Sequence, residues 1–140
     1  MNNADKQQLF ERIRAAVLRL MPTVWAIYAH GSIVKDQERR DSDLDIALLL
    51  PPGERVADPL GLAASLAAVA GREVDIADLR QAGNFLCKEV LANGETLYVA
   101  NPEQVLNWEA IAMSEYATHR ERIRDLLDDF NKTGIGYAHE

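Results

Sequence analysis

The chain has 140 residues, of which 48% are hydrophobic and 26% charged, and its formal net charge is −7. This length and composition are those of one folded domain with a real core and exclude a disordered chain. The acidic balance, without a basic stripe, argues against a sequence-independent grip on DNA, which depends on clustered Lys and Arg.

Features that the sequence lacks exclude further classes of protein. The single cysteine, Cys87, excludes an internal disulfide and a zinc site built from cysteines, and the histidines His30, His119 and His139 lack ligand spacing. The longest apolar run, within residues 59–70, is too short to span a membrane, and the polar N-terminus lacks the apolar core of a signal peptide. We therefore expect a cytoplasmic protein without a membrane partner.

The periodicity of apolar residues predicts helices and strands in alternation. In chain order we expect a helix over 4–20, a strand over 24–29, a short helix over 32–37, a strand over 44–50, a helix over 56–70, a strand over 73–79, a helix over 85–92, an edge strand over 96–100 and a long helix over 102–130. This order predicts an α/β (α+β) sandwich, with a small mixed sheet of about four strands flanked by helices. We expect one domain over 1–140, with its core at about 24–100.

The long final helix allows two interpretations. Its charged half, residues 119–129, can simply face solvent. The helix is also long enough that part of its apolar stripe would lack a partner within the chain. An unpartnered stripe would leave a surface for another protein.

Two acids start the strand expected over 44–50. Side chains alternate between the faces of a strand, so Leu44 and Ile46 would pack on the core while Asp43, Asp45 and Ala47 share the other face. Two carboxylates about 7 Å apart by their Cα atoms repel each other, and a shared divalent cation relieves that repulsion. Mg²⁺ prefers a few carboxylates completed by phosphate oxygens. The pair therefore predicts a metal and a phosphorylated substrate, although Asp-x-Asp at a strand start is also common in solvated turns.

A third acid is available on the next strand. Asp75 lies between Val74 and Ile76, which would face the core. In register with Asp45, it would give three acids for two Mg²⁺ ions, or it could accept a proton from the attacking hydroxyl. Glu73 and Asp78 remain alternatives for this role.

The residues before the acid pair favour phosphate binding. Gly31 permits a turn whose backbone N–H groups can reach a phosphate, and the Ser32 hydroxyl can bond the same group. Lys35 is the nearest cation and, with Arg39 or Arg40, could neutralise a triphosphate, although a solvated lysine is the plainer interpretation. Ser42, at the end of the polar loop, completes the nucleotide-binding candidates. We interpret His30 as packed or partly exposed rather than as a base.

Gly-Ser, a short gap, Asp-x-Asp and a later Asp resemble the polymerase-β-like nucleotidyltransferase superfamily. The short gap and the DSDLD segment resemble the minimal nucleotidyltransferases, in particular the MntA-type antitoxins that are encoded beside HEPN-domain toxins. The resemblance covers residues 24–100 well and the flanking helices more loosely. One departure is Ile33-Val34-Lys35, where many relatives carry an Arg just after Gly-Ser and a second turn of small residues.

The resemblance implies a mechanism and roles by position. It implies a nucleotidyltransferase fold, Mg²⁺ and a nucleoside triphosphate. Gly31 and Ser32 would hold phosphate, Asp43 and Asp45 would bind metal, and Asp75 would act as a metal ligand or base. It further implies a partner, a HEPN-type RNase toxin that is silenced when a hydroxyl, on a tyrosine, receives AMP from ATP.

Two other functions remain open. The chain could adenylylate a small-molecule hydroxyl, as antibiotic-modifying transferases do. It could also be an antitoxin that acts by binding alone and keeps a vestigial site. The intact acids speak against the latter, because a site without function has no physical reason to keep clustered repelling charges.

Overall fold

The computed structural model describes residues 1–35 and 43–133, and within this part four strands form one sheet in the order β3-β2-β1-β4. β1 runs antiparallel to β2 and β4, and β2 runs parallel to β3. The predicted mixed sheet, with its fourth strand at an edge, is confirmed. The elements are α1 (Asn3–Leu20), β1 (Ala26–His30), the 3₁₀ helix η1 (Gly31–Ile33), β2 (Leu44–Leu49), α2 (Pro59–Ala70), β3 (Val74–Asp78), α3 (Asn84–Asn93), β4 (Glu95–Val99) and α4 (Pro102–Thr133).

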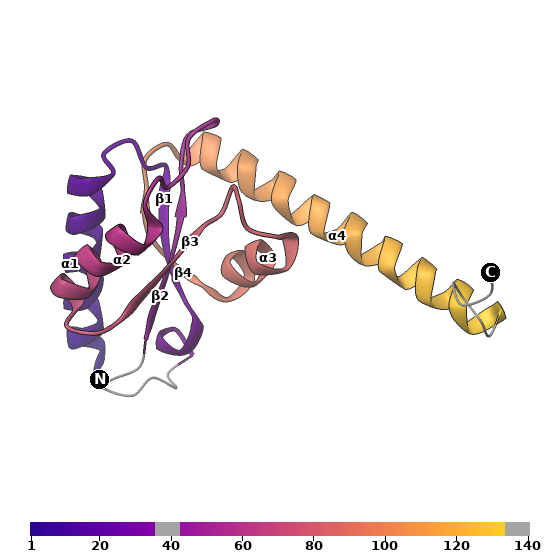
Figure 1. The fold of residues 1–140 in the computed structure, drawn as a ribbon, viewed down its shortest axis with the longest axis horizontal. Helices are drawn as coiled ribbons and strands as arrows, with labels where there is room; N and C mark the ends of the chain where they lie inside the picture. Colours follow the sequence, from indigo (N-terminus) through magenta and orange to yellow (C-terminus); the bar gives the residue numbers. More distant parts are fainter. Residues whose placement is uncertain (36–42, 134–140) are drawn as a thin grey trace.

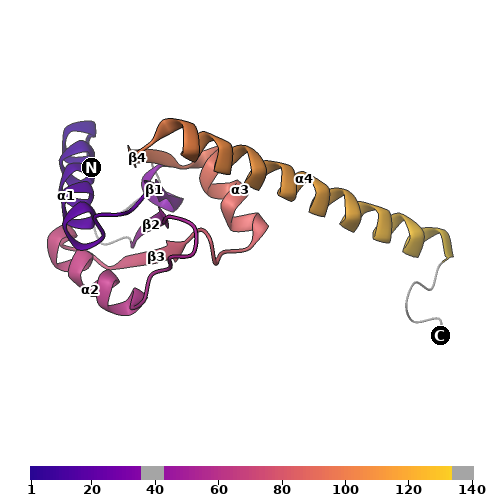
Figure 2. The ribbon, with the colours of Figure 1, turned by 90° about the horizontal axis from the view of Figure 1, so that it is seen from above.

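Helices cover both faces of the sheet. Figures 1 and 2 show α1 and α2 on one face, and α3 with the beginning of α4 on the other. Leu44, Ile46 and Leu48 are buried in the core under α1 and α2, as the alternation predicts. Ala47 and Leu49 are also buried, in a second core that includes residues of α3 and α4. The face of β2 that carries Asp45 is therefore also packed at its far end, because α3 and α4 cover it there.

Two helix starts differ from the prediction. The helix expected from residue 56 begins at Pro59, because the Asp58 side chain caps it by accepting from Gly61 N. Val56 lies before it and is buried. The short helix expected over 32–37 is the single 3₁₀ turn η1, and its expected end, from residue 36, lies outside the described residues.

The final helix leaves the body of the protein. Val105 is buried, and the Tyr28 hydroxyl donates a 2.7 Å hydrogen bond to Glu109 Oε2, which fixes the first turns of α4 to the sheet. Beyond Tyr116 every side chain described is exposed, and Figure 1 shows the helix projecting away from the other elements. The apolar residues Ile123 and Leu127 of this part are exposed, as the second interpretation of the helix expects. None of the described helices combines the length and apolar character needed to cross a membrane.

Candidate active site

Two carboxylates face each other across neighbouring strands. Asp45 of β2 and Asp75 of β3 are register partners in the parallel ladder. The hydrogen bond from Leu44 N to Glu73 O, at 2.9 Å, sets this register at the first residue of β2. Asp43 comes one residue before the strand and is exposed. The prediction that Asp75 lies in register with Asp45 is confirmed.

The charge on Asp45 is held in an unfavourable environment. Burial raises the pKa of Asp45 above its ordinary value, and the nearby carboxylates of Asp75 and Asp43 raise it further, while His30 acts in the opposite direction. Asp75 and Asp43 are thus close enough to disfavour the charge on Asp45. An arrangement of repelling carboxylates is typical of a site that a cation completes.

Gly31 lies directly against the Asp45 carboxylate. Its φ of +79° is favourable only for glycine, and a Cβ at this position would overlap Asp45 Oδ2. The turn continues through hydrogen bonds from Val34 N to Gly31 O and from Lys35 N to Ser32 O. Ser32 is half-buried in this turn. The Gly-Ser turn and the acids therefore form one site.

His30 is the antiparallel register partner of Asp45. It is half-buried, as expected, and burial lowers its pKa, an effect that the carboxylates of Asp45 and Glu89 partly oppose. Glu89 belongs to α3 and was not among the predicted site residues. Glu89 is close to His30 because of the way α3 packs on the sheet, and no local sequence pattern indicates that packing.

The remaining candidates separate clearly. Asp78 has a structural role, because its Oδ2 accepts from Val56 N at 2.9 Å and its Oδ1 accepts from Arg80 N at 3.1 Å. Glu73 is exposed, and so is Lys35. Ser42, Arg39 and Arg40 lie outside the described residues.

The acids suit a hard cation in kind but do not form a finished cage. In the parts of the chain that the structure describes, no group of three or more His, Cys, Asp or Glu is already arranged to hold a metal ion. Carboxylate oxygens are nevertheless the donors that Mg²⁺ prefers, and Mg²⁺ usually completes its shell with water and substrate phosphates. The register pair Asp45 and Asp75, with Asp43 beside it, fits that mode of binding.

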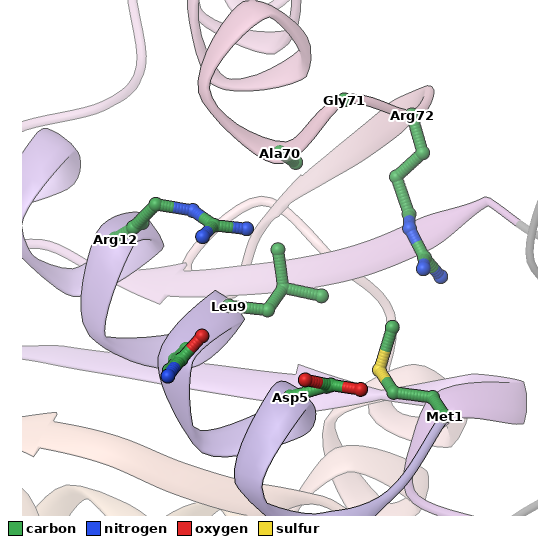
Figure 3. Close-up of a pocket in the computed structure, with 8 residues that line it drawn as sticks. Met1, Asp5, Leu9, Arg12, Ala70, Gly71 and Arg72 are labelled. Carbon is green, nitrogen blue, oxygen red and sulfur yellow. The ribbon is translucent and has the colours of Figure 1, made fainter.

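A hollow separate from these acids lies beside α1. It has a volume of about 610 Å³ and lies between α1 and the end of α2. Figure 3 shows the Arg12 and Arg72 side chains on opposite sides of it. None of the three acids lines it, so we do not assign it to the site. Its lining residues are Met1, Asp5, Gln8, Leu9, Arg12, Ala70, Gly71 and Arg72.

Comparisons with known proteins agree with this geometry. The family model described as polymerase beta, nucleotidyltransferase matches residues 13–103. The protein adenylyltransferase MntA of Shewanella oneidensis is 31% identical over 140 residues, which cover 95% of this chain and 96% of that protein.

Solved structures are similar over most of their length. A crystal structure of a toxin–antitoxin with AMP-PNP matches with a TM-score of 0.75 and 27% identity, over 86% of this chain and 96% of that chain. A structure of the tri-AMPylated Shewanella oneidensis HEPN toxin in complex with the MNT antitoxin matches with a TM-score of 0.72 and 25% identity, over 88% and 96%.

Proposed function

Because the chain belongs to the polymerase beta nucleotidyltransferase family, we propose that it is an antitoxin that transfers AMP from ATP to a hydroxyl of a HEPN-type toxin and thereby neutralises it. The similarity to the protein adenylyltransferase MntA extends over 95% of this chain and supports this activity. The relative in the complex with AMP-PNP supports ATP as the substrate. We place the reaction in the cytoplasm, where ATP is available and where the free thiol of Cys87 stays reduced.

One observation carries the proposal. Asp45 has Asp75 as its register partner on one side and Gly31 directly against its carboxylate on the other. A phosphate held by the Gly-Ser turn would therefore lie beside the acids. Nucleotidyl transfer needs the phosphate and the acids close together, because negative charge develops on the phosphate as the leaving group departs.

We assign the metal-binding role to Asp43, Asp45 and Asp75. When bound, Mg²⁺ supplies positive charge that offsets the charge of the triphosphate and polarises its α-phosphate. Two ions suit three acids of this kind, and the desolvated Asp45 carboxylate gains most from such a neighbour, because burial and the adjacent acids disfavour its charge.

The transfer step divides among the residues as follows. The acceptor hydroxyl oxygen, on a tyrosine of the toxin, forms a bond to the α-phosphorus of ATP. The bond from that phosphorus to the oxygen bridging to the β-phosphate breaks, and pyrophosphate leaves. Asp75, exposed at the start of β3, takes the hydroxyl proton. Gly31 and Ser32 hold the β- and γ-phosphates through backbone N–H groups and a hydroxyl, and we include Lys35 and Ser42 in nucleotide binding.

A growth experiment separates transfer from simple occlusion. Cells that express the cognate HEPN toxin together with the natural chain should grow. The variant Asp43→Asn/Asp45→Asn should leave the toxin active and growth arrested, although the protein accumulates to the same level. Growth restored equally by this variant would overturn the proposed activity in favour of an antitoxin that acts by binding alone.

A further inference from the structure

The apolar stripe of α4 continues past the end of the body. The partly or fully covered residues of α4 lie on the side that faces the rest of the protein and are Val105, Trp108, Glu109, Ala112 and Tyr116. Residues at multiples of the 3.6-residue turn share one side of a helix, so this side continues through Ile123, Leu126 and Leu127. The helix therefore carries one continuous stripe, whose first half packs on the body of the protein and whose second half is exposed.

The second half of the stripe is well exposed. Its members, which we call the distal stripe, are three large apolar residues with exposed side chains, namely Ile123 (44% exposed), Leu126 (43%) and Leu127 (58%). The first half packs on α3, and Figures 1 and 2 both show α4 extending well beyond α3. Where they part, a hollow of about 270 Å³ opens beside Asn84 of α3 and His119 of α4. The distal stripe thus lies on the part of α4 that continues past this hollow.

An exposed apolar stripe of this kind indicates a surface that binds another protein. An amphipathic helix gains most of its stability by packing its apolar side, and exposed apolar patches mark interaction sites. The flanking charges are ordered along the helix. Arg120, Arg122 and Arg124 lie at the start of the distal stripe, with Glu121 among them, and Asp125, Asp128 and Asp129 lie at its end, before Lys132. A complementary surface would be apolar, with acidic groups toward the body and basic groups toward the helix end.

We propose that the distal stripe is the surface on which the HEPN toxin docks, at the corner between α3 and the projecting half of α4. This inference rests on the proposed function, because it takes the toxin as the protein substrate. Relatives solved with their toxin support the toxin as the partner that covers this surface. The MntA alignment leaves out only 5% of this 140-residue chain, fewer residues than the 32 of α4, so it takes in most of that helix. The related chains were solved in complex with their toxin.

A binding experiment with the purified cognate HEPN toxin tests the docking surface. Ile123→Asp/Leu127→Asp places two charges in the distal stripe, at positions that contribute nothing to the core. We expect its Kd for the toxin to rise at least about tenfold. The control is Leu106→Asp, which changes a still more exposed leucine of the same helix (67% exposed) outside the distal stripe and should bind as the natural chain does. Unchanged AMP-PNP binding by both variants would show that the nucleotide site is intact.

The outcomes are distinguishable. An unchanged toxin Kd in the distal-stripe variant would overturn the docking surface even if AMP transfer takes place. A natural chain that forms a dimer by itself, and a distal-stripe variant that is monomeric but still binds toxin, would assign the surface to a second copy instead and also overturn it. Lost binding without any AMP transfer by the natural chain would uphold the docking surface and reject the proposed function.

Discussion

Gly31 and Asp45 are in such close contact that no side chain fits between them, because a Cβ at residue 31 would overlap Asp45 Oδ2. The contact joins the phosphate-binding turn to the carboxylate proposed to bind the metal. The two functions therefore depend on one another's position, and a change at the glycine acts on the acid.

Gly31→Ala should inactivate the enzyme by displacing Asp45. A misplacement of about 1 Å at a reacting group costs about 100-fold in rate, so AMP transfer should fall by at least that factor. The measurement is initial-rate transfer from labelled ATP to the toxin. Gly53→Ala is the matched control, because Gly53 also has a positive φ of 83° but has nothing within 4 Å of the added Cβ. If both variants lost activity equally, backbone strain rather than the contact with Asp45 would be responsible.

The two aspartates of β3 should behave oppositely. Asp75→Asn should abolish AMP transfer with little change in stability, because the side chain of Asp75 is exposed and the residue lies in register with Asp45. Asp78→Ala should cost about 1–3 kcal/mol of unfolding free energy, because it removes the acceptor of Val56 N and Arg80 N. Urea unfolding and transfer rates, measured on both variants, check the separation. A stable, active Asp78→Ala protein would contradict the structural role of that residue.

Removing the charge at Asp45 should stabilise the protein while it destroys activity. The raised pKa of Asp45 means that the folded chain binds this proton more tightly than the unfolded chain does, so the native carboxylate destabilises the fold at pH values above the folded pKa. Asp45→Asn should therefore melt at a higher temperature at pH 7 without Mg²⁺. Its advantage should shrink as the pH falls through the folded pKa toward the ordinary value near 3.8. A lower Tm for Asp45→Asn at pH 7 would show that the carboxylate is satisfied in the fold.

The hydrogen bond between Tyr28 and Glu109 should make the free energy of unfolding fall as the pH rises above 10. Burial raises the pKa of Tyr28 above its ordinary value of 10.0, and the hydrogen bond to Glu109 raises it further. The stabilisation is complete below pH 10 and is lost as the pH rises above it, because the unfolded tyrosine ionises first. The slope approaches about 1.4 kcal/mol per pH unit. Tyr28→Phe should cost about 1–3 kcal/mol at pH 7 and should lack this slope, as measured by denaturant unfolding across pH.

The sequence was sufficient to predict the strands and the register of the acids, for a physical reason. Alternation within a strand places Asp45 and Asp75 opposite buried aliphatic residues, and parallel pairing of the two strands then brings them side by side. Gly31 was likewise predictable, since a glycine before a polar loop indicates a close approach.

Other features depend on tertiary packing and left no local pattern. The burial of Ala47 and Leu49 follows from the way α3 and α4 cover the sheet, and the hydrogen bond that Asp78 accepts from Val56 N depends on the path of the loop that holds Val56. Glu89 approaches His30 for the same reason. Periodicity indicates which side of a helix is apolar, but it does not indicate where along the helix the body of the protein ends.

The most direct test of the proposed activity is intact-mass spectrometry of the purified HEPN toxin after incubation with ATP, Mg²⁺ and this chain. We predict that the toxin gains the mass of one or more AMP groups, and that it gains none with Asp43→Asn/Asp45→Asn or with EDTA. A toxin that forms the complex but keeps its original mass with the natural chain would contradict the assignment of this protein as an adenylyltransferase of its toxin.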